Sequence, residues 1–221
     1  MAMHGQFCAV ARAQDLVGGR WSLLIVRELL CGARRFNDIR RGIPRVSRTM
    51  LSERLQVLAA AGVVRRSEGP HGPEYDLTEA GRELIEVVKA LGVWGQRWLP
   101  RHADREEIDL DPLLLDMQRR VRPAAVPAEP FVIRLELKDC PVRFLLLKDR
   151  DIALCAHNPG FPEPLCLGGP VTALAGWWRG DTTFAEARRR GLTLTGTRAL
   201  VAGFPNWFER YLLADVAAAA S

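Results

Sequence analysis

The sequence predicts a mixed α/β (α+β) protein with two domains, the second built on an antiparallel sheet with helices on one face. Three observations predict this class. Residues 8–60 carry helical apolar spacing in short segments, and residues 63–77 are predicted to form two short strands around a Gly-Pro turn. After residue 131, strand patterns come first and helical patterns follow, an order typical of α+β domains.

The N-terminal half is organised around residues 20–66. Residues 8–17 predict a first helix that ends at Gly18-Gly19, and residues 21–30 are apolar on more than one face, as a buried helix should be. Phe36, Ile39 and Ile43 continue the helical spacing through a shorter segment. These segments predict a compact core of short helices.

A sharp turn and a capped helix follow. Pro44 disfavours a helical residue before it, and the Ser47 hydroxyl suits an N-cap. Leu51, Leu55 and Leu58 form one apolar stripe on the helix expected at 47–60. The opposite face has short polar side chains, so this helix could enter a major groove with its N-terminal end toward the bases.

The charge of this segment supports double-stranded DNA as the partner. Seven arginines lie between residues 34 and 54 against two acidic residues, Asp38 and Glu53. A solvated helical face is the alternative, but here the turn, the cap and the basic run coincide. The predicted DNA-contact residues, including two on the hairpin described next, are Arg35, Arg45, Ser47, Arg48, Thr49, Ser52, Arg54, Arg66 and His71.

The hairpin expected at 63–77 directly follows the recognition helix, which is the arrangement of a wing. Thr78 then caps a long helix that Pro100 ends. Its apolar stripe from Leu84 to Trp98 could pack on the winged domain. We expect part of it to meet a second copy of the chain, because helix-turn-helix proteins usually bind as dimers.

Length and composition bear on the number of domains and on where the positive charge lies. With 221 residues, 48% of them apolar, the chain can build one large core or two small ones. Residues 1–103 hold 16 basic and 10 acidic side chains, whereas the remainder holds 15 and 16. The basic half is therefore N-terminal.

No pattern points to catalysis or to a bound metal. The five cysteines include no CxxC pair, and the four histidines are scattered among loops and ends. We expect no enzyme activity, no cofactor and no metal. The absence of a long apolar run and of a signal-peptide layout predicts a cytoplasmic protein without a membrane span.

The N-terminal blocks DLVGGRWSLLIVRELLCGARRFNDI, SRTMLSERLQVLAAAGVVRR and YDLTEAG resemble the HxlR family of winged helix-turn-helix regulators. The resemblance covers roughly residues 8–98 and implies a bacterial homodimer that binds DNA. Family members often carry an N-terminal cysteine, which in some of them senses oxidants or electrophiles. Cys8 matches it and is the candidate redox sensor, but Ala9 replaces the proline that often follows.

After a charged linker expected at 101–110, a second domain is expected at 111–221. The Trp-x-Gly-Asp-like segment at 178–181, the Glu-Ala pair at 186–187 and the short strand before Gly196 resemble the sterol-carrier-protein type-two fold. Domains of that kind enclose an apolar cavity. The candidate ligand-binding residues are Phe144, Trp177, Trp178, Phe184, Trp207 and Phe208, each of which could instead fill a core.

The sequence therefore predicts a homodimeric winged helix-turn-helix transcriptional regulator, with residues 1–100 for DNA binding and dimerisation. It would bind a pseudo-palindromic operator and respond to a small apolar ligand or to thiol oxidation. The alternative is a carrier of an apolar molecule without operator specificity. The two differ in whether a defined DNA sequence is bound.

Overall fold

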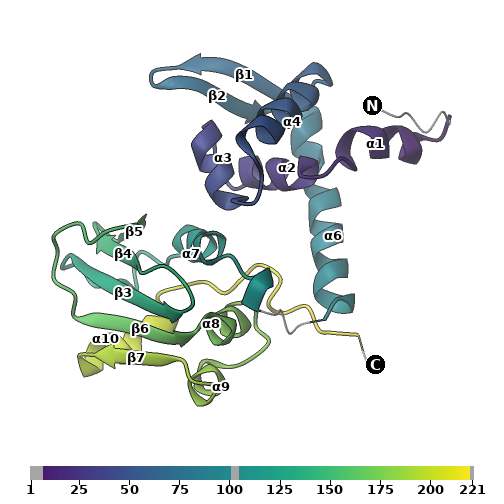
Figure 1. Ribbon diagram of the computed structural model, residues 1–221. Helices are drawn as coiled ribbons and strands as arrows, with labels where there is room; N and C mark the ends of the chain where they lie inside the picture. The colour runs from purple at the N-terminus through teal and green to yellow at the C-terminus, as the bar shows by residue number, and fades with distance from the viewer. Residues whose placement is uncertain (1–6, 101–104, 220–221) are drawn as a thin grey trace. The chain divides into compact units, whose positions relative to one another are not determined.

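The computed structural model describes residues 7–100 and 105–219. The chain divides between Gly92 and Val93 into two compact units (Figure 1). Among the described residues, no helix combines the length and the apolar character that crossing a membrane requires.

The N-terminal unit is a helical bundle with one hairpin. Its elements are α1 (Ala9–Val17), α2 (Ser22–Leu30), α3 (Phe36–Gly42), α4 (Arg48–Ala60), β1 (Val64–Gly69), β2 (Gly72–Leu77) and α5 (Glu79–Glu83), followed by α6 (Ile85–Trp98), which continues beyond Gly92. The helix expected after Thr78 is therefore divided at Leu84 into α5 and α6. Figure 1 shows β1 and β2 as a hairpin that projects from the helices.

The core of this unit forms where α2 and α4 bury their apolar faces. Ile25 and Val26 of α2 have no exposed surface, and the predicted stripe of Leu51, Leu55 and Leu58 is buried along α4. Trp21 precedes α2 with a φ of 78°, a left-handed conformation that few non-glycine residues adopt. The spacing that predicted these helices therefore corresponds to their buried faces.

The C-terminal unit contains the end of α6, then a short 3-10 helix, Arg105–Glu107, and α7 (Leu110–Arg119). The expected linker at 101–110 thus contains helical residues at its end, and its residues 101–104 lie outside the described ranges. The sheet consists of β3 (Phe131–Lys138), β4 (Arg143–Lys148), β5 (Asp151–Cys155), β6 (Leu165–Pro170) and β7 (Thr193–Gly196). Helices α8 (Val171–Trp178), α9 (Phe184–Arg189) and α10 (Arg198–Gly203) complete it, with a short 3-10 helix at Phe204–Asn206.

The strand order is β5-β4-β3-β6-β7, and three of the four pairings are antiparallel. The fourth pairing, β3 with β6, is parallel. The segment between β5 and β6 passes both β4 and β3 and returns to the end of the sheet at which β5 begins, so β6 runs in the same direction as β3. The expected α+β class is confirmed, and this one parallel pairing is a detail that the strand patterns did not predict.

One face of the sheet is the core of the unit. Along β3 the side chains of Phe131, Ile133, Leu135 and Leu137 are buried, while Glu136 and Lys138 are exposed. The indole Nε1 of Trp178 in α8 donates a hydrogen bond of 2.7 Å to Asp116 Oδ2 in α7, which joins two helices of this unit. The buried residues at alternate positions of β3 therefore belong to the core face of the sheet.

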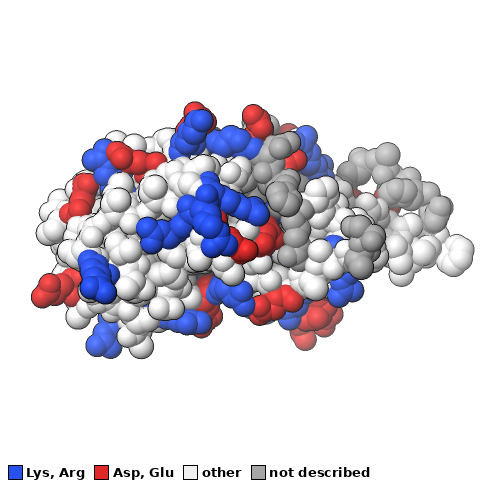
Figure 2. Space-filling model, turned by 90° about the horizontal axis from the view of Figure 1, so that it is seen from below, with Lys and Arg blue, Asp and Glu red and all other residues white. Residues whose placement is uncertain are grey.

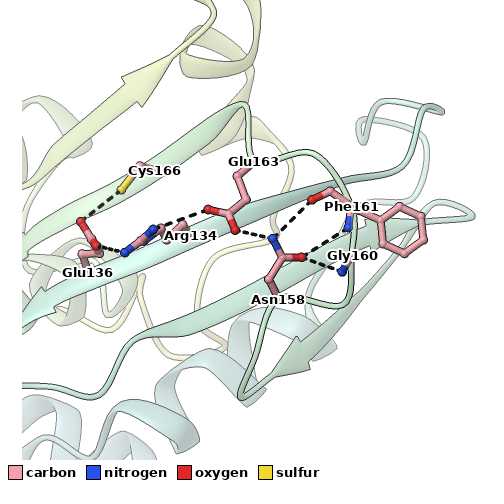
Figure 3. A network of polar contacts seen from close by, with 7 residues as sticks. All are labelled: Arg134, Glu136, Asn158, Gly160, Phe161, Glu163 and Cys166. Carbon is pink, nitrogen blue, oxygen red and sulfur yellow. Dashed lines mark hydrogen bonds and ion pairs between the residues drawn. The ribbon is translucent and has the colours of Figure 1, made fainter.

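The other face of the sheet carries a polar network (Figure 3). Arg134 on β3 pairs with Glu136 at 2.5 Å and with Glu163 at 3.9 Å. Glu163 also accepts a hydrogen bond from Asn158, whose Oδ1 in turn accepts one from the Gly160 N–H at 2.7 Å. These contacts attach the loop between β5 and β6 to the sheet.

Candidate nucleic-acid interface

The recognition helix predicted at 47–60 is α4, and Ser47 is its N-cap. The Met50 N–H donates a hydrogen bond of 3.1 Å to Ser47 Oγ, which satisfies one of the free donors in the first turn. Leu51, Leu55 and Leu58 hold the helix against the core. The opposite side is therefore presented to solvent with its polar groups in a fixed direction.

Five of the nine predicted contact residues lie at the start of α4 or just before it. Arg45, Ser47, Arg48, Thr49 and Ser52 are all exposed and lie within two turns of one another. The guanidinium of Arg48 lies over the Phe36 ring of α3, 6.0 Å from its centre. The polar groups of these exposed side chains could reach base edges in a major groove.

Arg54 lies on the flank of α4 that faces the core side. It is only half exposed, and one of its guanidinium nitrogens lies so close to Gly19 that a Cβ at residue 19 would come within 2.7 Å of it. Its direction differs from that of Arg48 and Ser52. The number of arginines in the sequence does not show that Arg54 points in a different direction from Arg48.

The hairpin forms the predicted wing, with His71 exposed in the turn between β1 and β2. Arg66 pairs with Glu68 at 3.1 Å. Arg35 pairs with Glu74 of β2 at 3.8 Å, and the Tyr75 N–H donates to the Arg34 carbonyl at 2.8 Å. Residues 34–35 thus bridge to β2, which fixes the base of the wing beside the start of α3.

A buried carboxylate behind the turn was not predicted. Glu28 in α2 is 1% exposed, and its Oε1 accepts hydrogen bonds from Arg27 at 3.0 and 2.7 Å. Arg27 also donates to the carbonyl of Gly42, the last residue of α3. A Cβ at residue 42 would lie 2.0 Å from Glu28 Oε2, so a larger residue there would have to displace this buried carboxylate. The sequence feature that could have indicated this contact is the charged pair Arg27-Glu28 inside the apolar run SLLIVRELL.

A family model described as HxlR-like helix-turn-helix matches residues 16–103. The HTH-type transcriptional regulator Rv3095 of Mycobacterium tuberculosis is 47% identical over 98 residues, which are 42% of this chain and 60% of that protein. The HTH-type transcriptional regulator YvaP of Bacillus subtilis is 38% identical over 91 residues, 40% of this chain and 84% of that protein. The chain belongs to the HxlR-like helix-turn-helix family.

The expected membership is thereby confirmed for the N-terminal part of the chain. The chain spans about 60% of the length of the mycobacterial relatives. Among solved structures, the reduced form of the transcriptional regulator YodB from B. subtilis shares 35% identity over 41% of this chain and 93% of that one, with a TM-score of 0.37.

Cys8 of this HxlR-like protein is the residue before α1. Its sulfur makes no capping hydrogen bond, but the backbone N–H groups of Ala11 and Val10 lower the pKa of its thiol. Burial instead raises the pKa of Cys140 and of Cys166. Of these three cysteines, Cys8 is the one whose surroundings favour the reactive thiolate.

Four of the six predicted ligand-binding aromatics of the HxlR-like protein are buried together. Trp177, Trp178, Trp207 and Phe208 surround Phe204, which is fully buried and has ring contacts of 5.4–5.8 Å with three of them. Sequence reasoning did not single out Phe204. The rings of the cluster pack against one another. These four side chains therefore fill the core, which was the alternative to ligand binding.

The two remaining aromatics have different positions. Phe144 pairs with Arg134 and Cys155 on the polar face of the sheet, away from the cluster. Phe184 is partly exposed, and its ring lies 5.0 Å from that of Trp177.

Acidic and basic side chains are interspersed across the face of the molecule that Figure 2 displays. Within the described residues, no three His, Cys, Asp or Glu side chains are placed to hold a metal ion.

Proposed function

We propose that this HxlR-like protein is a transcriptional regulator that binds double-stranded DNA in a sequence-specific manner, with α4 in the major groove and the β1–β2 wing beside it. The observation that carries the proposal is the capped helix α4, packed on one side and polar on the other. Arg48, Thr49 and Ser52 would reach base edges, and Arg45, Arg66 and His71 would contact phosphates. Its site of action would be the cytoplasm.

The active form would be a homodimer. On α6, Val87, Leu91, Trp94 and Trp98 are 46–60% exposed, and their spacing places them along one side of the helix. Contiguous apolar surface of this kind favours a protein partner over solvent. A second copy would cover it symmetrically, so the operator would be a pseudo-palindrome with half-sites about one or two helical turns apart.

The C-terminal unit, for which we propose a sterol-carrier-protein-like fold, would sense a ligand. Its five-stranded sheet, covered by helices on one face and rich in aromatics, supports this role. Oxidation of Cys8 would be a second input. Either signal can regulate only by favouring one of two dimer states that differ in DNA affinity, and typical couplings of about 1–3 kcal/mol change affinity by roughly 5- to 150-fold.

Fluorescence anisotropy with a labelled operator, obtained by selection from random duplexes, tests the proposal. Binding should saturate at two chains per site and weaken steeply as salt is raised, because phosphate contacts release counterions. Light scattering should show a dimer without DNA. Binding of DNA that is equal for the selected and a scrambled duplex would contradict the proposal and favour the carrier alternative.

A further inference from the structure

A hollow of about 710 Å³ lies on the C-terminal unit between α9, β7 and α10. Its volume falls in the roughly 300–1,000 Å³ range that small-molecule sites occupy. All of its lining residues belong to this one unit. It is therefore a candidate site whose geometry is independent of how the two units are placed.

The lining of the hollow is largely apolar. Phe184, Leu194, Val201 and Pro205 contribute apolar surface. The Phe184 ring lies 5.0 Å from Trp177 and 6.0 Å from Phe204, between ring centres, so the base of the hollow is continuous with the buried aromatic cluster. An apolar group placed there would be removed from water against a packed, rigid surface.

The lining also contains two cations, Arg188 and Arg198, and no acidic residue. In the described part of the chain, neither guanidinium forms an ion pair. The single acid of α9, Glu186, is engaged elsewhere: its Oε2 accepts hydrogen bonds from Thr183 N and Oγ1 at 2.7 and 2.8 Å, and its Oε1 lies 3.9 Å from Arg189. The hollow thus combines an apolar base with positive charge that the protein does not compensate.

We infer that this hollow binds a small carboxylic acid with an apolar body, the body lying on Phe184 and Val201 and the carboxylate between Arg188 and Arg198. A carboxylate matches the planar donor fork of arginine, and a neutral apolar molecule would leave both cations without a partner. The inference deepens the sensing role proposed above and rests on it. It replaces a generic apolar effector with an anionic one.

Calorimetric titration of the full chain, without DNA, tests the inference. The probe is 2-naphthoate, and 2-naphthamide is the neutral control of the same shape. We expect saturable binding of one 2-naphthoate per chain, and binding of the amide weaker by about tenfold or more, since charge-assisted hydrogen bonds are lost. Absence of saturable 2-naphthoate binding, or equal binding of acid and amide, would overturn the inference.

Two double variants locate the site. Arg188→Gln/Arg198→Gln should weaken 2-naphthoate binding by about tenfold or more, whereas Arg189→Gln/Arg190→Gln removes the same charge from α9 and its C-cap and should leave it unchanged. An equal loss in both variants would show a general charge effect and would also overturn the inference. Because the titration contains no DNA, its failure is distinguishable from failure of operator binding.

Discussion

The guanidinium of Arg48, the first residue of α4, lies over the ring of Phe36, the first residue of α3, at 6.0 Å from the ring centre. This contact joins the two helices on either side of the turn at their N-terminal ends. A cation–π contact of this kind stabilises by about 0.5–1 kcal/mol at an exposed site. It restricts the directions that the Arg48 side chain can take before DNA is bound.

Arg48→Ala should weaken operator binding by about 1–3 kcal/mol if Arg48 reads a base edge, with the loss concentrated on the selected sequence. Anisotropy titrations at several salt concentrations measure this. If Arg48 contacts phosphate only, the loss should be equal on all sequences and the salt slope should fall by about one unit. Arg189→Ala, which removes the same charge from α9, is the control, and an equal loss there would contradict the assignment.

Two substitutions of Ser47 distinguish its role as a helix cap from its role in DNA contact. Ser47→Ala removes the acceptor of the Met50 N–H and should reduce the stability of the N-terminal unit by about 1 kcal/mol. Ser47→Asp keeps a capping oxygen, so stability should be retained while the added negative charge repels phosphate and weakens DNA binding. Urea denaturation and anisotropy measure the two effects. Unchanged DNA binding in Ser47→Asp would place the N-terminus of α4 away from the DNA.

Gly42→Ala should destabilise the protein by about 1–3 kcal/mol, because the new methyl group would overlap the buried carboxylate of Glu28. Gly95→Ala in α6 is the matched control. A Cβ there meets its nearest atom at an ordinary 3.6 Å, and replacing a helical glycine should stabilise by about 0.5–1 kcal/mol. Urea denaturation followed by circular dichroism compares them, and a Gly42→Ala protein as stable as the wild type would show that the turn relaxes freely.

The cysteines should differ in how their alkylation depends on pH. Iodoacetamide reacts with the thiolate, so a lowered pKa moves the rise in rate to lower pH and a raised pKa moves it to higher pH. Cys8 should therefore reach its maximal rate at a lower pH than Cys140 or Cys166. Mass spectrometry of peptides from a pH series gives the three profiles, and reaction of Cys140 before Cys8 would reverse this order.

The features that the sequence predicted well depend on local chemistry. The proline turn, the serine cap and the leucine stripe together specify α4, because each acts within a few residues. The wing followed from two β-favouring runs around Gly69 and Gly72.

The features it missed depend on partners far along the chain. The parallel pairing of β3 with β6 is decided by the path of the loop from 156 to 164, and strand patterns do not encode that path. The orientation of Arg54 toward Gly19 and the burial of Glu28 beside Gly42 are likewise long-range contacts. Phe204 lies at the centre of the aromatic cluster because of the packing of α8 and α9, which its own neighbours in the sequence do not show.

Selection of binding sites from random duplex DNA with the wild type and with Ser52→Arg tests the central claim most directly. Ser52 is exposed on α4, and a new arginine there would pair with guanine O6 and N7 if this face reads the major groove. We predict a pseudo-palindromic site for the wild type, and for Ser52→Arg a site that gains guanine at the same position of each half. Selection of the same sequence by both proteins, or of no sequence by either, would contradict the placement of α4 in the major groove.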